Sequence, residues 1–167
     1  MKIPIVALPL IVALTAGCSS PVIVTQTAEP TSDNNGFITL YLDDQNGAPT
    51  INCVIPIANQ TYSLDQSGDA DECNNNDTHY FSLDNVPSAT TIEFYDDDKC
   101  KEKTIDFYYK IRTIKNPTTT PTRIDSIKTG QSPDGTIMAP GVQLVYSNRK
   151  RIDDDLSCID MKLSPKP

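Results

Sequence analysis

The chain has 167 residues, with 14 Lys and Arg against 22 Asp and Glu, and a formal net charge of −8 at pH 7. This acidic balance argues against nucleic acid and anionic lipid surfaces as electrostatic partners, because both require clustered basic residues. A chain of this size buries about two thirds of its unfolded surface, so we expect a core that needs no metal or cofactor.

The first seventeen residues have the pattern of a secretory signal. Lys2 is followed by an apolar run from Ile3 to Ala16. Roughly fourteen apolar residues are too few to cross a bilayer core of about 30 Å, and Pro4 and Pro9 disfavour a helix interior. We therefore predict a signal peptide over residues 1–17, rather than a transmembrane or buried helix.

The end of this segment, Leu14-Thr15-Ala16-Gly17-Cys18, resembles the lipobox of bacterial lipoproteins. The resemblance implies cleavage before Cys18 and attachment of lipid to that cysteine. In such lipoproteins an Asp after the cysteine favours the inner membrane, whereas Ser19 and Ser20 follow here. The resemblance therefore implies an outer-membrane, lipid-anchored protein, and we expect its domain to face the periplasm. Cleavage removes Lys2 and leaves a side-chain charge of −9, which is 13 minus 22.

Residues 18–36 contain the lipidated cysteine and a segment rich in Ser, Thr, Pro, Ala and Asn, with no sustained hydrophobic period. This composition is typical of a flexible linker. At about 3.3 Å per residue, some seventeen residues reach roughly 55 Å when stretched. We expect a tether between the lipid and a single domain at residues 37–167.

From residue 37 onward the sequence has short alternating segments rich in β-branched and aromatic side chains. They span residues 37–42, 91–95, 104–111 and 142–146. Such alternation favours β-strands. Thirteen prolines, two of them in the run Asn116–Pro121, argue against a long helix after the signal. The predicted fold class is all-β, a disulfide-stapled β-sandwich.

These segments show internal sequence similarity. A strand that ends in an aromatic residue and a polar turn occurs at residues 38–44 and 92–98, with a weaker copy at 142–148. A second strand-like element recurs at residues 78–83, 123–128 and 156–161. We interpret the recurrence as an uneven internal repeat of two elements.

The repeat resembles the Greek-key motif of the βγ-crystallins, best at residues 89–130 and in truncated form at 135–163. This resemblance implies a crystallin-like sandwich, and the alternative is a generic β-sandwich with similar hairpins. Microbial members bind calcium through two Asn or Asp, two variable residues, and then Ser or Thr followed by Ser. Asp153–Cys158 follows that order except at Cys158, so the resemblance implies Asp154 and Ser157 as calcium ligands. Solvated turns are the other explanation for such acidic runs.

Four cysteines remain besides the lipidated one: Cys53, Cys73, Cys100 and Cys158. An even number in an oxidising compartment indicates two disulfides, and no Cys-x-x-Cys pair of the zinc or thioredoxin kind is present. Of three possible connectivities we favour Cys53–Cys73 with Cys100–Cys158, and the other two stay open at this point. Closing the shorter loop stabilises the fold by roughly 3 kcal/mol on the chain-entropy estimate.

Residues for catalysis are sparse. His79 is the single histidine, and neither a Gly-x-Ser-x-Gly elbow nor a His-Glu-x-x-His motif occurs. We therefore expect no enzymatic activity.

By analogy with small β-rich lipoproteins, these features predict a module that binds another protein through loops, as an inhibitor or immunity protein against an exported toxin or enzyme. One alternative is a structural or assembly lipoprotein of a secretion, pilus or envelope machine. Another is a calcium-binding crystallin-like domain without a dedicated partner, which predicts a higher melting temperature in calcium.

Overall fold

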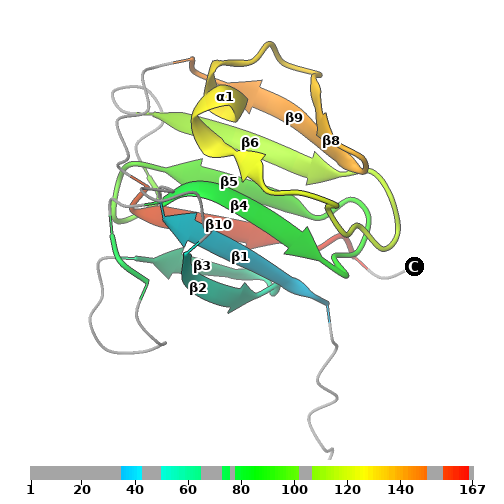
Figure 1. Cartoon of the computed structure of the whole chain (residues 1–167), viewed down its shortest axis with the longest axis horizontal. Helices are drawn as coiled ribbons and strands as arrows, with labels where there is room; N and C mark the ends of the chain where they lie inside the picture. The colour runs from blue at the N-terminus through cyan, green and yellow to red at the C-terminus, as the bar shows by residue number, and fades with distance from the viewer. Residues whose placement is uncertain are drawn as a thin grey trace, which may run out of the picture. The chain divides into compact units, whose positions relative to one another are not determined.

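The computed structural model describes residues 35–42, 50–64, 73–75, 78–101, 107–149 and 156–165. Within these ranges the elements are β1 (Phe37–Leu42), β2 (Ile51–Pro56), β3 (Gln60–Ser63), β4 (Thr78–Asp84), β5 (Thr91–Tyr95), β6 (Tyr108–Thr113), β7 (Ile124–Asp125), α1 (Ser126–Gln131), β8 (Ile137–Ala139), β9 (Val142–Ser147) and β10 (Cys158–Lys162), as Figure 1 shows.

The strands form two sheets. One has the order β2-β1-β4-β7 and the other has the order β3-β10-β5-β6-β9-β8. Neighbouring strands in both sheets run antiparallel. The predicted all-β sandwich with two disulfides is confirmed.

The core lies between the sheets and follows from the alternation along each strand. Ile38 and Leu40 of β1 have no exposed surface and belong to the same cluster as Ile92 and Phe94 of β5. Phe81 of β4 meets Phe94 across the two layers, with ring centroids 5.0 Å apart. These contacts hold the two sheets face to face.

The three strands with internal sequence similarity, β1, β5 and β9, are interior strands of their sheets. β1 lies between β2 and β4, whereas β5 lies between β10 and β6, and β9 lies between β6 and β8. A central strand is hydrogen-bonded on both sides, so its backbone is well specified. All three similar segments therefore form interior strands of a sheet. β1 belongs to the four-stranded sheet, and β5 and β9 belong to the six-stranded sheet.

The element predicted at residues 123–128 is strand-like only at β7 and then becomes α1. Asp125 is the N-cap residue, and its side chain accepts a hydrogen bond from the Lys128 backbone N–H at 2.9 Å. The buried Tyr109 and Ser126 hydroxyls lie 2.6 Å apart and connect β6 to the helix. The cap and this buried bond favour the helical turn over a longer strand.

The described residues all belong to one compact unit, Asp33–Pro167. The predicted signal peptide and Cys18 lie outside the described residues, as does the predicted tether up to residue 34. Among the described helices, none is long and apolar enough to span a membrane.

Candidate protein-recognition surface

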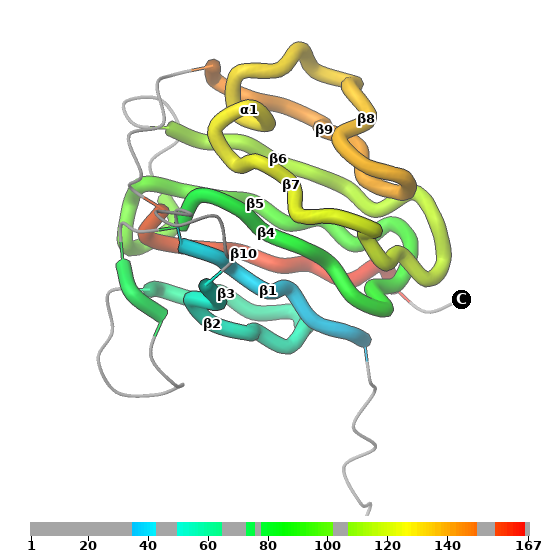
Figure 2. Tube along the Cα trace, viewed as in Figure 1, coloured from blue at the N-terminus to red at the C-terminus, as the bar shows by residue number. Residues whose placement is uncertain are grey.

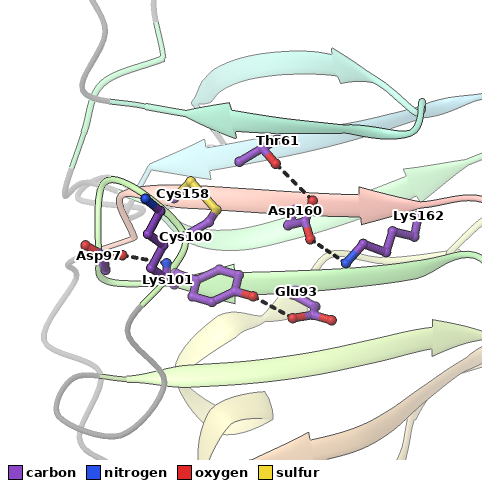
Figure 3. Close-up of a disulfide and its surroundings, with 9 residues drawn as sticks. Thr61, Glu93, Asp97, Cys100, Lys101, Cys158, Asp160 and Lys162 are labelled. Carbon is purple, nitrogen blue, oxygen red and sulfur yellow. Dashed lines mark hydrogen bonds and ion pairs between the residues drawn. A yellow bond between two sulfur atoms is a disulfide. The ribbon is translucent and has the colours of Figure 1, made fainter.

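The two disulfides join the pairs that we favoured from the sequence. Cys53–Cys73 closes a separation of 20 residues with a Cα–Cα distance of 5.0 Å. Cys100–Cys158 closes 58 residues at 5.4 Å and attaches the turn after β5 to the start of β10 (Figure 3). The first crosslink therefore attaches residue 73 to the middle of β2, and the second attaches the turn after β5 to the first residue of β10.

A row of directly opposite residues crosses the outer face of the six-stranded sheet. Thr61, Asp160, Glu93 and Lys110 follow one another on β3, β10, β5 and β6. Thr61 donates a hydrogen bond to Asp160 at 3.0 Å, and Lys110 Nζ lies 2.9 Å from Glu93 Oε1 (Figure 3 shows the Thr61–Asp160 bond). Lys162 pairs with Asp160 at 3.0 Å. Each of the two facing carboxylates thus has its own lysine, which offsets their mutual repulsion.

The Glu93 carboxylate also accepts hydrogen bonds from two tyrosines. The hydroxyls of Tyr95 and Tyr108 lie 2.5 Å and 2.9 Å from its Oε2 atom. Burial raises the pKa of Tyr95 above its usual value, and the hydrogen bond to Glu93 raises it further. Since Cys158 packs in the same cluster as both rings, this polar group is built into the scaffold around the second disulfide.

The outer face of the four-stranded sheet has a different character. We call it the open face, and its residues are Phe37, Thr39, Tyr41, Ile51, Val54, Pro56, Tyr80, Ser82, Asp84, Arg123 and Asp125, placed by strand alternation and register. Phe37 is 40% exposed and Val54 is 52% exposed. Arg123 lies 5.5 Å from the ring centroid of Tyr41 and 5.0 Å from that of Tyr80. The aromatic and apolar character of this face contrasts with the charged row on the other sheet.

Three loops meet at one end of the sandwich. We call this end the crown, formed by residues 85–90 after β4, 114–122 after β6, and 140–141 between β8 and β9; Figure 2 shows them side by side. Val86 and Thr118 exchange backbone hydrogen bonds of 2.9 Å and 2.7 Å, and Ile114 N–H donates to Gly141 at 2.8 Å. The crown is therefore joined across all three loops.

Threonine hydroxyls fix the backbone of the crown. The buried Thr113 hydroxyl donates to the Pro87 carbonyl at 2.6 Å and accepts from the Thr90 N–H at 3.0 Å. The Thr118 hydroxyl donates to the Lys115 carbonyl at 2.8 Å. Side chains of this kind replace the water that loop backbone groups usually bind, so the loop conformation is set by the fold.

Two crown residues have left-handed backbone conformations that are uncommon without glycine: Asn85 with φ of 54° and Ala89 with φ of 59°. Outward from this fixed backbone, Lys115, Asn116 and Pro117 are exposed, and Ile114 is 49% exposed. The crown thus presents a basic, an amide and two apolar side chains on a hydrogen-bonded support. Such a surface is suited to contact with another protein.

The candidate metal residues from the sequence are only partly described. Asp154 lies outside the described residues. Ser157 is buried, its backbone N–H donates to Tyr95 at 2.9 Å, and its carbonyl accepts from Leu64 at 2.8 Å. The described part of the chain contains no group of three or more His, Cys, Asp and Glu side chains arranged to hold a metal.

His79, the single histidine, is half-buried at the start of β4, with its ring 6.4 Å from that of Tyr80.

Comparison with protein-family models, with curated proteins and with solved structures finds no match to this chain. The candidate site consequently rests on the geometry of the crown and the open face.

The crown was not predicted from the sequence. The run Asn116–Pro121 argues against a helix in the sequence, and in the structure it supplies the central crown loop. The available signal was the density of threonine beside proline, because a hydroxyl near a turn often bonds to loop backbone. The partners of these hydroxyls lie some 20 to 40 residues away, so only the topology reveals them.

Proposed function

We propose that this chain is a lipid-anchored protein of the outer membrane whose domain binds another protein through the crown. In this proposal it is a non-enzymatic inhibitor or immunity protein against an exported toxin or enzyme. The observation that carries the proposal is the crown itself, in which exposed side chains stand on three loops joined by backbone and threonine hydrogen bonds.

Fixed loops favour tight binding for a thermodynamic reason. A loop that is mobile in the free protein loses conformational freedom when it binds, and this loss weakens the complex. In the crown, the ordering has already taken place during folding, because Val86 and Ile114 donate their backbone hydrogens to neighbouring loops and Thr90 donates to the Thr113 hydroxyl of β6. More of the contact energy then remains as affinity.

Charge adds a second argument. The mature chain has a side-chain charge of −9, whereas the outermost crown residues are mostly uncharged. A basic partner would be attracted by the acidic domain as a whole and would then make its close contacts at the crown. Long-range attraction of this kind raises association rates and weakens with salt.

The experiment is affinity capture from a cell-envelope extract with residues 19–167, which contain the whole compact unit, followed by mass spectrometry. Ile114→Asp places a charge on the crown. Ile137→Asp makes the same change at a side chain of similar exposure, 54% against 49%, on β8, which belongs to the same six-stranded sheet as β6 but lies outside the crown. We expect one exported toxin or enzyme to be retained in stoichiometric amount by the unchanged protein and by Ile137→Asp, and to be lost with Ile114→Asp.

Other results would contradict the proposal. Retention of several subunits of one envelope machine would indicate an assembly lipoprotein, and equal retention by both variants would place the binding surface elsewhere. If nothing is retained, the crown is not a binding site for a soluble fragment, and a calcium titration of the melting temperature becomes the next measurement. Anchoring is tested separately, because Cys18→Ser should transfer the protein from the membrane fraction to the soluble fraction.

A further inference from the structure

The open face has an unusual distribution of charge. Asp84 lies at the end of β4, opposite Phe37 in the register. The Arg123 guanidinium lies toward the other end of the strands, over Tyr41 and Tyr80. Between these two groups are Thr39, Ser82 and Val54, which carry no charge. Asp125 is also on this face, opposite Tyr80, but its carboxylate caps α1 and pairs with Lys128 at 3.1 Å. Asp84 and the Arg123 guanidinium are therefore separated along the strand direction by an uncharged middle row.

The face rather than an edge is the surface available for docking. β2 is the edge strand beside the open face, but it ends at Pro56, which has no N–H to donate, and the Pro56 carbonyl already accepts from Gln60. At the other edge β7 is only two residues long. Addition of a partner strand is disfavoured at both edges, whereas Phe37, Ile51 and Val54 remain exposed on the face.

We propose that the open face packs against the same face of a second copy of this chain, about a two-fold axis that crosses the strands at the Thr39 row. A two-fold interface must be complementary to itself. Rotation about this axis exchanges the two ends of the strands, so Asp84 of each copy meets Arg123 of the partner subunit. The same rotation places Phe37 against Tyr41 of the partner subunit.

The middle row lies on the axis, so its residues meet their own counterparts. Val54 faces Thr39 within one sheet and approaches Val54 of the partner subunit across the interface. The row on the axis thus combines the apolar Val54 with the uncharged Thr39 and Ser82. Opposite charges toward the rim are the arrangement found in stable protein interfaces. The crown belongs to the ends of the strands and not to the packed face, so this association and the proposed partner binding use different surfaces.

The test is sedimentation velocity on residues 19–167 over a range from about 1 μM to 1 mM. We expect a monomer–dimer equilibrium for the unchanged protein. Val54→Glu places two like charges at the axis and should raise the dissociation constant at least tenfold. Ile137→Glu is the matched control on the six-stranded sheet and should leave the dimer unchanged.

A charge exchange makes the test specific for the axis. Asp84→Arg alone brings two cations together at each rim contact, and Arg123→Asp alone brings two anions together, so each variant should be monomeric. When the two variants are mixed, both rim contacts again join opposite charges. Native mass spectrometry should then detect a one-to-one heterodimer of the two variants.

Three results would overturn the inference: a monomer at every concentration, a dimer indifferent to Val54→Glu, or no heterodimer on mixing the charge variants. Melting curves of each variant establish that it is folded before its association is interpreted. Capture of a partner by Val54→Glu is expected to equal that of the unchanged protein. Failure of the dimer and failure of crown binding are therefore separate outcomes.

Discussion

The Tyr95 hydroxyl donates a 2.5 Å hydrogen bond to the carboxylate of Glu93, which lies two residues earlier on the same strand. Residues two apart on a strand share a face, so this pair lies on the outer side of β5. Tyr108 and Lys110 complete the surroundings of the carboxylate from β6. The nearly buried Glu93 carboxylate is thereby bonded by side chains from two neighbouring strands. The protonated tyrosine hydroxyls therefore help to hold β5 and β6 together.

Unfolding should become easier at alkaline pH because of Tyr95 and Tyr109. Burial raises the pKa of both hydroxyls, and for Tyr109 the Ser126 hydrogen bond only partly opposes it. The folded protein keeps both protons at a pH where the unfolded chain releases them. Their contribution to stability is therefore fully present below about pH 10 and falls above it, by up to about 1.4 kcal/mol per pH unit for each tyrosine.

Urea unfolding between pH 8 and 11.5 measures this slope. Tyr95→Phe and Tyr109→Phe should each reduce it by one proton, and the double variant should reduce it by two. Tyr95→Phe also loses its bond to Glu93, which lowers stability at every pH, but the slope is a separate readout. A slope that is the same in all four proteins would contradict the assignment.

Gly36 should tolerate alanine far less well than Gly135 does. Both have left-handed backbones, with φ of 80° and 87°, but a Cβ at Gly36 would lie 2.0 Å from the Asp84 carbonyl oxygen, whereas a Cβ at Gly135 meets nothing within 4 Å. Gly135→Ala should cost about 1–2 kcal/mol from backbone strain alone. Gly36→Ala should cost at least about 2 kcal/mol more, because β1 must move away from Asp84. Chemical denaturation of the two variants checks the difference, and equal losses would show that the close approach is unimportant.

Removal of the Thr113 hydroxyl should loosen the crown. Thr113→Val keeps the shape of the side chain but leaves the buried Thr90 N–H without its acceptor, and this should cost about 1–3 kcal/mol. Thr113→Ser keeps the hydroxyl and should lose only the packing of one methyl group, about 1 kcal/mol. Amide hydrogen exchange at Thr90 should accelerate in Thr113→Val and stay slow in Thr113→Ser. Unchanged exchange in the valine variant would mean that other bonds fix the loop.

The two disulfides should contribute unequally to stability. On the chain-entropy estimate, the 20-residue separation of Cys53 and Cys73 corresponds to about 3 kcal/mol and the 58-residue separation of Cys100 and Cys158 to about 4 kcal/mol. Replacing both cysteines of a pair by alanine avoids free thiols. We expect the Cys100/Cys158 variant to unfold at the lower denaturant concentration, since it also removes the buried Cys158 side chain from the cluster that it forms with Tyr95 and Tyr108. The reverse order would show that residual structure in the unfolded chain outweighs loop closure.

Several strands could be predicted from the sequence because their pattern was unambiguous. β1 and β5 have the predicted bounds, and β9 extends only one residue further, to Ser147. The strand predicted at residues 104–111 is observed at Tyr108–Thr113, and residues 102–106 lie outside the described residues. At its end the Thr113 hydroxyl donates to the Pro87 carbonyl and accepts from the Thr90 N–H, and no local sequence pattern predicts bonds to such distant residues.

Other features depended on tertiary position. β2 ends in Pro56 and exposes Ile51 and Val54, so it lacks the usual signature, and its proline is tolerated because the strand lies at an edge. The open face could not be predicted because its composition becomes visible only after β1, β2 and β4 are placed in register. Pairing of the cysteines, in contrast, followed the favoured pattern of two successive crosslinks.

The position of β1 also determines how the domain would bear a mechanical load. The chain reaches the sandwich at Gly36, whose carbonyl accepts from Ile57, and continues directly into β1. Because β1 has β2 on one side and β4 on the other, a pull along the strand from its first residue loads two ladders of hydrogen bonds together, in shear. Rupture then requires many bonds to break at once rather than in succession, so the domain is built to resist tension applied through Gly36, the last residue of the predicted tether.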